Sequence, residues 1–248
     1  MTLEIQDLHV KVSDVEVIKG VSLKFERGTT QALMGPNGSG KSSLSLALAG
    51  HPKYTITKGR VIMDGVDLAT LSVDERARAG LFLSFQTPCE VEGVTISSFL
   101  RTAVNTRKEK KYSVLEFHKL LLEKMAQLQI DPLFARRSLN VGFSGGEKKR
   151  LEMLQLLLLE PKYALLDETD SGLDVDALRT VAQGIRVAQK QLSMGIVVIT
   201  HYTRFLEYLQ PEVISILAQG KIVKTGGKEL AQVIEKKGFE PFLKGVKE

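Results

Sequence analysis

The sequence predicts an α/β fold with a mainly parallel core sheet, an antiparallel β-subdomain and an inserted helical lobe. Apolar strand-like runs alternate with helical patterns along most of the chain, which is typical of a parallel sheet covered by helices. Residues 3–25 instead alternate apolar and polar side chains, as antiparallel strands do. A stretch of helical periodicity, at approximately 87–148, interrupts the core pattern. At 248 residues, 43% of them hydrophobic, the chain can bury a full core, and we expect a single domain over 1–248.

Local patterns place the elements that precede the lobe. The alternating segment ends at Gly28, and the apolar run 32–34 predicts a strand that leads into a glycine-rich loop. A helix is expected over 41–48, because Gly50 is a typical helix stop. Two further elements are expected before the lobe, a strand over 59–68 and a short helix over 73–79.

The lobe and the C-terminal part of the chain follow from the same patterns. Within the lobe, Asp131-Pro132 ends a helical run. The apolar residues of that run at helical spacing are Leu115, Leu120, Leu121, Met125 and Leu128. Beyond the lobe we expect helices over 147–159, from about 176, and over 228–237, with strands over 163–166, 195–200, 213–217 and 220–224.

The glycine-rich loop has the spacing of a phosphate-binding P-loop, in which glycine, four residues and a second glycine precede lysine and serine. Its glycines allow a tight turn whose backbone N–H groups point at a β-phosphate, and the following helix adds its positive dipole end. Lys41 supplies a cation for the β- and γ-phosphates, and Ser42 is placed to ligate Mg2+. The predicted nucleotide-binding residues are Gly35, Pro36, Asn37, Gly38, Ser39, Gly40, Lys41, Ser42 and Ser43.

A second anion-binding motif precedes the helix expected over 147–159. Ser144, Gly145 and Gly146 combine a hydroxyl with exposed backbone N–H groups at a helix N-terminus. Taken alone, such a motif is more often a flexible turn than a binding site. Because the chain also has a P-loop, it would carry two binders of a γ-phosphate.

Three residues with titratable side chains follow strand-like runs. The apolar run 163–166 is typical of a buried parallel strand, and it delivers Asp167 and Glu168 at the carboxyl end, where α/β sheets place their ligands. Asp167 would hold Mg2+ through water. Glu168 would be the general base for an attacking water, a role worth about 10²–10⁴-fold in rate, or alternatively a second solvated acid. His201 likewise follows the run 195–200, where a lone histidine is usually structural.

Together and in this order, these motifs resemble the signature of ABC-type P-loop ATPases. The matching segments are 35–43, 143–147, 165–168 and 199–201. In that family the serine-glycine-glycine of one subunit closes over nucleotide held by the P-loop of another. The resemblance therefore implies ATP as the ligand and a transient ATP-dependent homodimer.

The same resemblance assigns roles to three further parts of the chain. It makes His201 the switch histidine that hydrogen-bonds the γ-phosphate. It makes Gln86 the glutamine that approaches Mg2+ and the attacking water. It makes 170–174, with Asp174 at its end, the loop that communicates across the dimer. A helix N-cap and turn is the plainer interpretation of that loop, and both can hold at once.

Within the ABC class, several stretches look like the SufC family. Glu147 stands where most transporters carry glutamine, and Asp170 with Ser171 replaces the usual small residues. Further matches are 140–142, 200–202 and 220–226. SufC proteins are soluble ATPases of the SUF iron–sulfur cluster assembly machinery, so the resemblance implies SufB and SufD-like scaffold partners and coupling of ATP use to their conformation. The alternative is the nucleotide-binding subunit of a membrane ABC transporter, whose partner is a permease.

Composition limits the other possibilities. The net charge is +5, but 34 basic residues are interspersed with 29 acidic ones, which does not favour nucleic-acid binding. No apolar run approaches the roughly 18 residues of a spanning helix, so we expect no direct membrane insertion. The N-terminus lacks a basic and apolar leader, which predicts a cytoplasmic location. Cys89 is the only cysteine and the four histidines show no zinc-like spacing, so we expect no internal disulfide, iron–sulfur cluster or structural metal.

The wall that would contact a nucleobase is unusual for the family. Transporter ATPases commonly stack adenine on an aromatic residue of the first hairpin, but residues 10–17 contain none. Val12, Val15 or Val17 would give only apolar contact. We therefore expect loose discrimination between bases.

Two further features leave alternatives open. Lys148 or Lys149 either pairs with Glu168 in a resting state or lies on a solvated helix face. Residues 87–100 are more apolar than a loop needs, so they either dock a partner or pack into the lobe's own core. The apolar residues in question are Val91, Val94, Ile96, Phe99 and Leu100.

Overall fold

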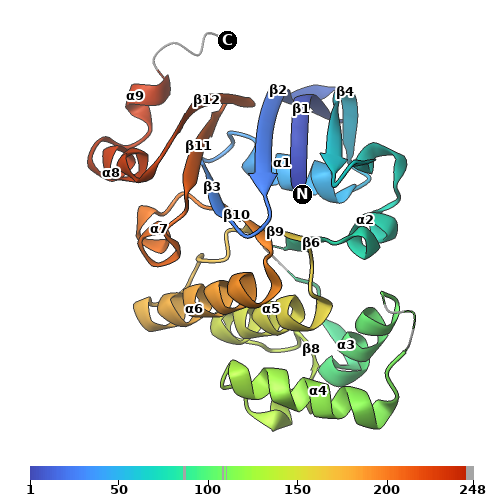
Figure 1. The fold of residues 1–248 in the computed structure, drawn as a ribbon. Helices are drawn as coiled ribbons and strands as arrows, with labels where there is room; N and C mark the ends of the chain where they lie inside the picture. Colours follow the sequence, from blue (N-terminus) through green and yellow to red (C-terminus); the bar gives the residue numbers. More distant parts are fainter. Residues whose placement is uncertain (86–87, 108, 110, 244–248) are drawn as a thin grey trace.

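The computed structural model describes residues 1–85, 88–107, 109 and 111–243, and it has the predicted α/β architecture (Figure 1). A six-stranded core sheet has the order β12-β11-β3-β10-β9-β6. Its strands are β3 (Thr30–Met34), β6 (Leu81–Ser84), β9 (Tyr163–Asp167), β10 (Gly195–Ile199), β11 (Val213–Ala218) and β12 (Lys221–Gly226). The pairings from β11 across to β6 are parallel, and β12 is antiparallel at the edge. The mainly parallel core sheet is therefore confirmed.

The antiparallel β-subdomain is confirmed as well. Its order is β2-β1-β4-β5, with antiparallel pairing between neighbours. The strands are β1 (Thr2–Val12), β2 (Val15–Glu26), β4 (Tyr54–Met63) and β5 (Val66–Asp67). Strand β4 begins at Tyr54 rather than at Gly59, because Gly59 marks a close approach inside the strand instead of its start. A Cβ there would lie 2.3 Å from the carbonyl oxygen of Asp7.

The core sheet is packed on both faces, because its strands send alternate side chains to two apolar clusters. Leu33 of β3 faces the cluster shared with the β-subdomain and with α1 (Lys41–Ala49). Ala32 and Met34 face the opposite cluster, which four helices cover. These are α5 (Gly145–Leu159), α6 (Val175–Leu192), α7 (Thr203–Leu209) and α8 (Lys228–Lys237). Packing on both faces leaves the carboxyl ends of the parallel strands to form a site.

Shorter elements complete the core: η1 (Leu68–Thr70), α2 (Val73–Ala79) and α9 (Glu240–Leu243). Both α2 and α8 lie at the predicted residues. Helix α5 begins at Gly145 rather than at 147, because Ser144 is its N-cap. Within the described part of the chain, no helix is both long and apolar enough to cross a lipid bilayer.

The helical lobe lies beside α5 and away from the β-subdomain (Figure 1). Its elements are β7 (Val91–Thr95), α3 (Ile96–Asn105), α4 (Val114–Gln127), η2 (Pro132–Arg136) and β8 (Ser138–Leu139). Helix α5 belongs to both the lobe and the core. Its Leu151 and Leu154 pack in the lobe's apolar cluster, whereas Met153 and Leu157 pack in the core cluster.

Two expectations about the lobe need correction. The sequence patterns do not predict α3, and this helix buries Ile96 and Leu100 completely in the lobe's own cluster. The candidate docking surface within 87–100 therefore reduces mainly to Val91 and Val94, which are 37% and 36% exposed. In α4, Leu115 is 65% exposed although it fits the helical pattern.

Candidate functional site

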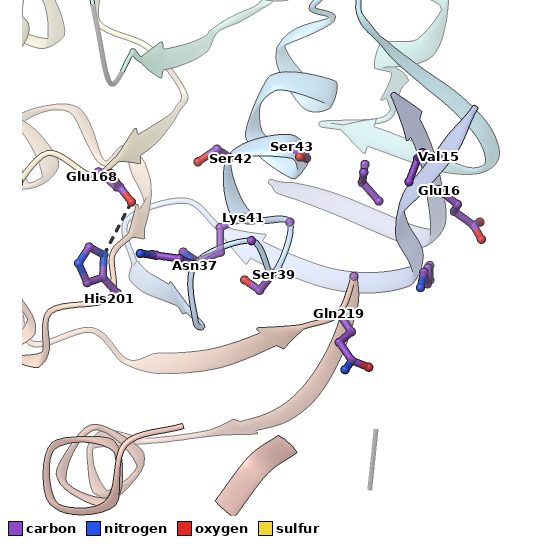
Figure 2. A pocket seen from close by; sticks show the side chains of 15 residues that line it. Val15, Glu16, Asn37, Ser39, Lys41, Ser42, Ser43, Glu168, His201 and Gln219 are labelled. Atoms are coloured by element: carbon purple, nitrogen blue, oxygen red, sulfur yellow. Dashed lines mark ion pairs between the residues drawn. The ribbon is translucent and has the colours of Figure 1, made fainter. Parts of the chain in front are cut away.

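A cavity of about 790 Å³ opens where β3, β9 and β10 end (Figure 2). The P-loop residues from Asn37 to Ser43 form one wall. Glu168, after β9, and His201, after β10, form a second wall, and the first residues of β2 form a third. The fold thus brings together three of the predicted motifs, which lie far apart in the sequence.

The P-loop is held so tightly that only glycine fits at its start. A Cβ on Gly35 would lie 2.1 Å from the carbonyl oxygen of Leu217. Lys41, only 5% exposed, donates from Nζ to the carbonyl oxygens of Gly35, at 2.9 Å, and Pro36, at 3.0 Å. Burial lowers the pKa of Lys41, while the nearby carboxylates act in the opposite direction. The loop therefore holds the ammonium group in place before any ligand arrives.

Asp167 ends β9 in a buried position beside α1. Its Oδ2 accepts a hydrogen bond from the Ser45 hydroxyl at 3.2 Å, and its Oδ1 has no hydrogen-bond partner among the described residues. Burial raises the pKa of the Asp167 carboxyl, against the nearby hydroxyls of Ser42 and Ser45, which lower it. The sequence motifs do not include Ser45, although it lies one helical turn after Lys41 and so on the same face of α1. A buried carboxylate oxygen without a protein donor suits a hydrated cation.

Glu168 and His201 converge from neighbouring strands. The Nδ1 atom of His201 lies 3.7 Å from Oε1 of Glu168, the contact drawn as a dashed line in Figure 2. Glu168 has a φ of 47°, which is uncommon for a residue with a side chain. Its N–H donates to the carbonyl oxygen of Ile199 at 2.9 Å, which fixes this conformation. The arrangement places a carboxylate and an imidazole together beside the P-loop.

The outer wall of the cavity contains residues that the sequence patterns do not predict. Val15 and Val17 line it, as expected for two of the three candidate valines, and Val12 is not among the lining residues. The unpredicted members are Glu16, Lys19, Gln219 and Gly220. They join the wall because the Lys19 N–H donates to the carbonyl oxygen of Gly220 at 2.8 Å, across the fold. Such a long-range contact leaves no local signal in the sequence.

The serine-glycine-glycine motif does not line the cavity of its own chain. Ser144 is the exposed N-cap of α5, and its Oγ accepts from the Glu147 N–H at 3.2 Å. In return, Oε2 of Glu147 accepts from the Ser144 N–H at 2.8 Å. The Ser144 N–H, the Arg137 guanidinium and the Ser144 hydroxyl, which all contact the Glu147 carboxylate, lower its pKa. The motif, including Gly145 and Gly146, is therefore preformed at the helix N-terminus.

Two predicted residues remain. Asp174 caps α6, where its Oδ1 accepts from the Ala177 N–H at 2.8 Å, so the capping interpretation of this residue is confirmed. It does not line the cavity of its own chain. Gln86, expected near Mg2+ and the attacking water, lies outside the described residues.

Lys148 and Lys149, which follow the serine-glycine-glycine motif, form ion pairs with residues other than Glu168. The Nζ atom of Lys148 lies 3.9 Å from Oε1 of Glu90. The Nζ atom of Lys149 lies 3.1 Å from Oε2 of Glu152, and both side chains are buried, at 8% and 6% exposure. Burial raises the pKa of Glu152, against the attraction of Lys149, which lowers it. Neither alternative from the sequence therefore describes Lys149. Charged side chains are rarely buried, and the spacing of three residues between Lys149 and Glu152 does not show that the pair is buried.

Known proteins are similar to this chain in sequence. The family described as "ABC transporter" matches residues 18–171. Vegetative protein 296 of Bacillus subtilis (strain 168) is 51% identical to this chain, over 96% of this chain and 92% of that protein. The probable ATP-dependent transporter ycf16 of Pyropia yezoensis is 48% identical, over 96% of each chain.

Solved structures agree on the fold. An ATP-binding subunit of an ABC transporter superposes with a TM-score of 0.78 at 24% identity, over 96% of this chain and 94% of that chain. A dimeric ATP-binding cassette in a post-hydrolysis state, bound to ADP and Pi, gives a TM-score of 0.78 at 22% identity, over 92% of this chain and 99% of that chain. With a family match across 18–171 and relatives near half identity over most of its length, this chain belongs to the ABC transporter family, as one of its ATPase domains.

Proposed function

We propose that this chain binds ATP and Mg2+ in the cavity. One set of residues there binds the nucleotide and the metal ion, and a second set takes part in hydrolysis. Lys41 and the P-loop N–H groups hold phosphate charge that is already present in bound ATP. Ser42 and Asp167 hold Mg2+, and the carboxylate Oδ1 of Asp167, which has no donor among the described residues, supports this assignment. Once bound, Mg2+ neutralises charge on the phosphate oxygens.

Glu168 and His201 act on the reaction itself. Glu168 takes a proton from the attacking water as its oxygen bonds to the γ-phosphorus. The bond from that phosphorus to the β–γ bridging oxygen then breaks, and ADP leaves with the electron pair. His201 donates a hydrogen bond to the γ-phosphate, and Gln86 orients the water. The observation that carries this assignment is the 3.7 Å approach of His201 to Glu168 beside the P-loop.

Hydrolysis in this proposal needs a second copy of the chain. Ser144 is exposed and does not line the cavity of its own chain. Its capping bonds with Glu147 fix the hydroxyl and the N–H groups of Gly145 and Gly146 as a rigid anion-binding surface. Each γ-phosphate would then lie between Lys41 of one copy and Ser144 of the other, and each dimer would hold two such sites.

The cellular role that fits best is the ATPase subunit of a SUF-type iron–sulfur cluster assembly complex with SufB and SufD-like scaffold proteins. Support comes from the two places where the chain departs from the transporter pattern. Glu147 completes the α5 cap and pairs with Arg137. Asp170 is 6% exposed and hydrogen-bonded to Thr200. Each of these two residues thus makes specific contacts in the fold.

An apolar groove between the core and the lobe is the proposed docking site for the scaffold. The groove, of about 330 Å³, is lined by Phe82, Phe85, Val91 and Phe99, among others. Phe85 is 54% exposed, so it adds to the apolar surface that this groove offers to a partner. The groove is lined by residues of β6 in the core and of β7 and α3 in the lobe. A movement of the lobe relative to the core would therefore displace a partner bound here.

The second candidate role is the nucleotide-binding subunit of a membrane transporter. The names of the relatives favour it, since ycf16 of Pyropia yezoensis is called a probable ATP-dependent transporter. Affinity purification of the tagged chain from its native cells in mild detergent distinguishes the two roles. Two soluble β-rich proteins would support the scaffold, whereas a protein with several membrane-spanning helices would overturn it. Release of phosphate from ATP by the purified complex, lost in Glu168→Gln, tests the reaction separately.

A further inference from the structure

Asp170 is a buried carboxylate that the proposed reaction does not use. It lies two residues after Glu168 and is 6% exposed. Its Oδ2 accepts a hydrogen bond from the Thr200 hydroxyl at 2.5 Å, a short distance that is typical of a hydroxyl donating to a carboxylate. Its Oδ1 has no hydrogen-bond partner among the residues that the structure describes. Burying a carboxylate is unfavourable unless it serves an interaction, so this position needs an explanation.

Thr200 turns that hydrogen bond into a constraint on the residue that follows it. Thr200 is fully buried, and its Oγ1 also accepts from the Tyr202 N–H at 2.9 Å. The Thr200 hydroxyl has a single proton, which it donates to Asp170. Its oxygen is therefore oriented to accept the hydrogen bond from the Tyr202 N–H. The chain of bonds from Asp170 through Thr200 to Tyr202 therefore spans His201 on both sides.

His201 has few contacts of its own to fix its ring. Its Nδ1 is buried without a hydrogen-bond partner among the described residues, and lies 3.7 Å from Oε1 of Glu168. The ring packs on that of Tyr202, with centroids 4.0 Å apart. The orientation of the imidazole thus depends on its contacts with Tyr202 and Glu168 and on its backbone, which the Thr200 hydrogen bonds constrain on both sides.

The charges around Asp170 shift the pKa of its carboxyl in both directions. Burial, the largest effect, raises the pKa of Asp170, and the charge of Glu168 raises it further. The Thr200 hydrogen bond and attraction to His201 act in the opposite direction. The Thr200 bond is therefore the main compensation for keeping this group buried next to Glu168.

We propose that Asp170 is a positioning residue for His201, acting through the Thr200 hydroxyl and the Tyr202 N–H. The proposal rests on the proposed role of His201 at the γ-phosphate. It makes the loop 170–174 and the segment 200–202 a single mechanical unit. A displacement of that loop would then change the angle at which His201 meets the γ-phosphate, without any change in how Lys41 holds ATP.

The test uses two substitutions that differ by one hydroxyl. Thr200→Val keeps the side-chain shape but removes the donor, whereas Thr200→Ser keeps the donor. We expect kcat for ATP hydrolysis to fall roughly tenfold to a hundredfold in Thr200→Val, the order of loss for a misplaced catalytic group. KM should stay within about threefold, because the P-loop contacts remain. Thr200→Ser should restore most of the lost kcat.

A double-mutant cycle tests whether Asp170 acts through Thr200. Asp170→Ala should lower kcat as Thr200→Val does, and the double variant should show no further loss, because both changes break one bond. Additive losses, or a parental kcat in Thr200→Val, would overturn the proposal. If Asp170→Ala does not fold, the comparison of Thr200→Val with Thr200→Ser decides the matter alone.

Two controls distinguish positioning by Asp170 from general destabilisation and from an error in the role of His201. Ser215→Ala removes a buried hydroxyl that pairs with Thr225 at 3.1 Å and does not line the cavity, so it should lower the melting temperature without lowering kcat. An equal fall of kcat in that variant would attribute the loss to general destabilisation and contradict positioning. A parental kcat in His201→Ala would refute the role of His201 itself. A low kcat in His201→Ala with a parental kcat in Thr200→Val would refute only the positioning by Asp170.

Discussion

The two halves of the proposed composite site hold their polar groups in opposite ways. Around the P-loop, several buried side-chain atoms have no hydrogen-bond partner among the described residues: Ser39 Oγ, Asp167 Oδ1 and His201 Nδ1. The other half is the serine-glycine-glycine motif at 144–146, here called the signature half. There Ser144 and Glu147 hydrogen-bond each other, and Arg137 forms an ion pair with Glu147. Buried polar atoms without partners are costly, so the P-loop half is complete only with ligand, metal or water. We expect nucleotide to rearrange contacts in the P-loop half and to leave the signature half unchanged.

The largest expected effect compares one glutamate from each half. Glu168→Gln removes the proposed base, so turnover should fall by about 10²–10⁴-fold while ATP binding persists. Glu147→Gln is the matched control, because glutamine can still accept the Ser144 N–H in the cap. Its turnover should stay within about threefold of the parent. Steady-state phosphate release measures both, and similar losses in the two variants would end the distinction between the halves.

The sequence predicts residues whose roles lie in contiguous motifs, and it misses residues whose roles depend on contacts between distant segments. The P-loop, Asp167 and Glu168 are predicted because each role lies in a contiguous motif whose spacing is fixed by the chemistry. Thr200 and Gln219 are missed, since their roles arise only where distant segments meet. The lobe is predicted as helical, but α3 is not, and the buried Lys149 could not be foreseen.

The second prediction concerns the lobe that carries the signature. Leu100→Ala should destabilise the protein by about 2–5 kcal/mol, because Leu100 is wholly buried in the lobe's cluster. Val91→Asp is the control, and its melting temperature should hardly change, since Val91 is 37% exposed. That variant should instead lose the proposed scaffold partners in a pull-down, because an aspartate is costly to bury unpaired in an apolar contact. A lower melting temperature of Val91→Asp would instead show that Val91 packs in the lobe's own core and does not form a docking surface.

The third prediction compares two lysines. Lys41→Ala should weaken ATP binding by roughly ten- to a hundredfold, the usual loss when a hydrogen bond from a charged group to a ligand disappears. Lys148→Ala, in the signature half, removes a loose 3.9 Å pair with Glu90 and should change affinity by less than about threefold. Calorimetry with Mg2+–ATP, in the Glu168→Gln background to prevent turnover, measures both. Equal affinities would show that Lys41 does not hold the phosphates.

The fourth prediction joins the halves. Lys41→Ala and Ser144→Arg chains should each be inactive alone, because every composite site then lacks one contribution. In an equal mixture, half of the dimers are mixed, and one of their two sites is intact, so about a quarter of the parental activity should return. Cross-linking must first show that mixed dimers form. Mixed dimers without recovered activity would mean that each chain completes its own site.

The smallest effect concerns the far end of the nucleotide. Val15, at the β2 wall of the cavity, is 66% exposed, so it offers a base only a partial apolar contact. Val15→Ala should therefore weaken ATP and GTP by the same small factor, about two- to threefold. Val15→Tyr should strengthen both by roughly tenfold, since an aromatic ring stacks on any base. Titration of ATP and GTP with the three proteins measures this. If Val15→Ala changes the ratio of the ATP and GTP affinities, this wall of the cavity discriminates between bases. The P-loop half would then be selective for the base as well as for the phosphates.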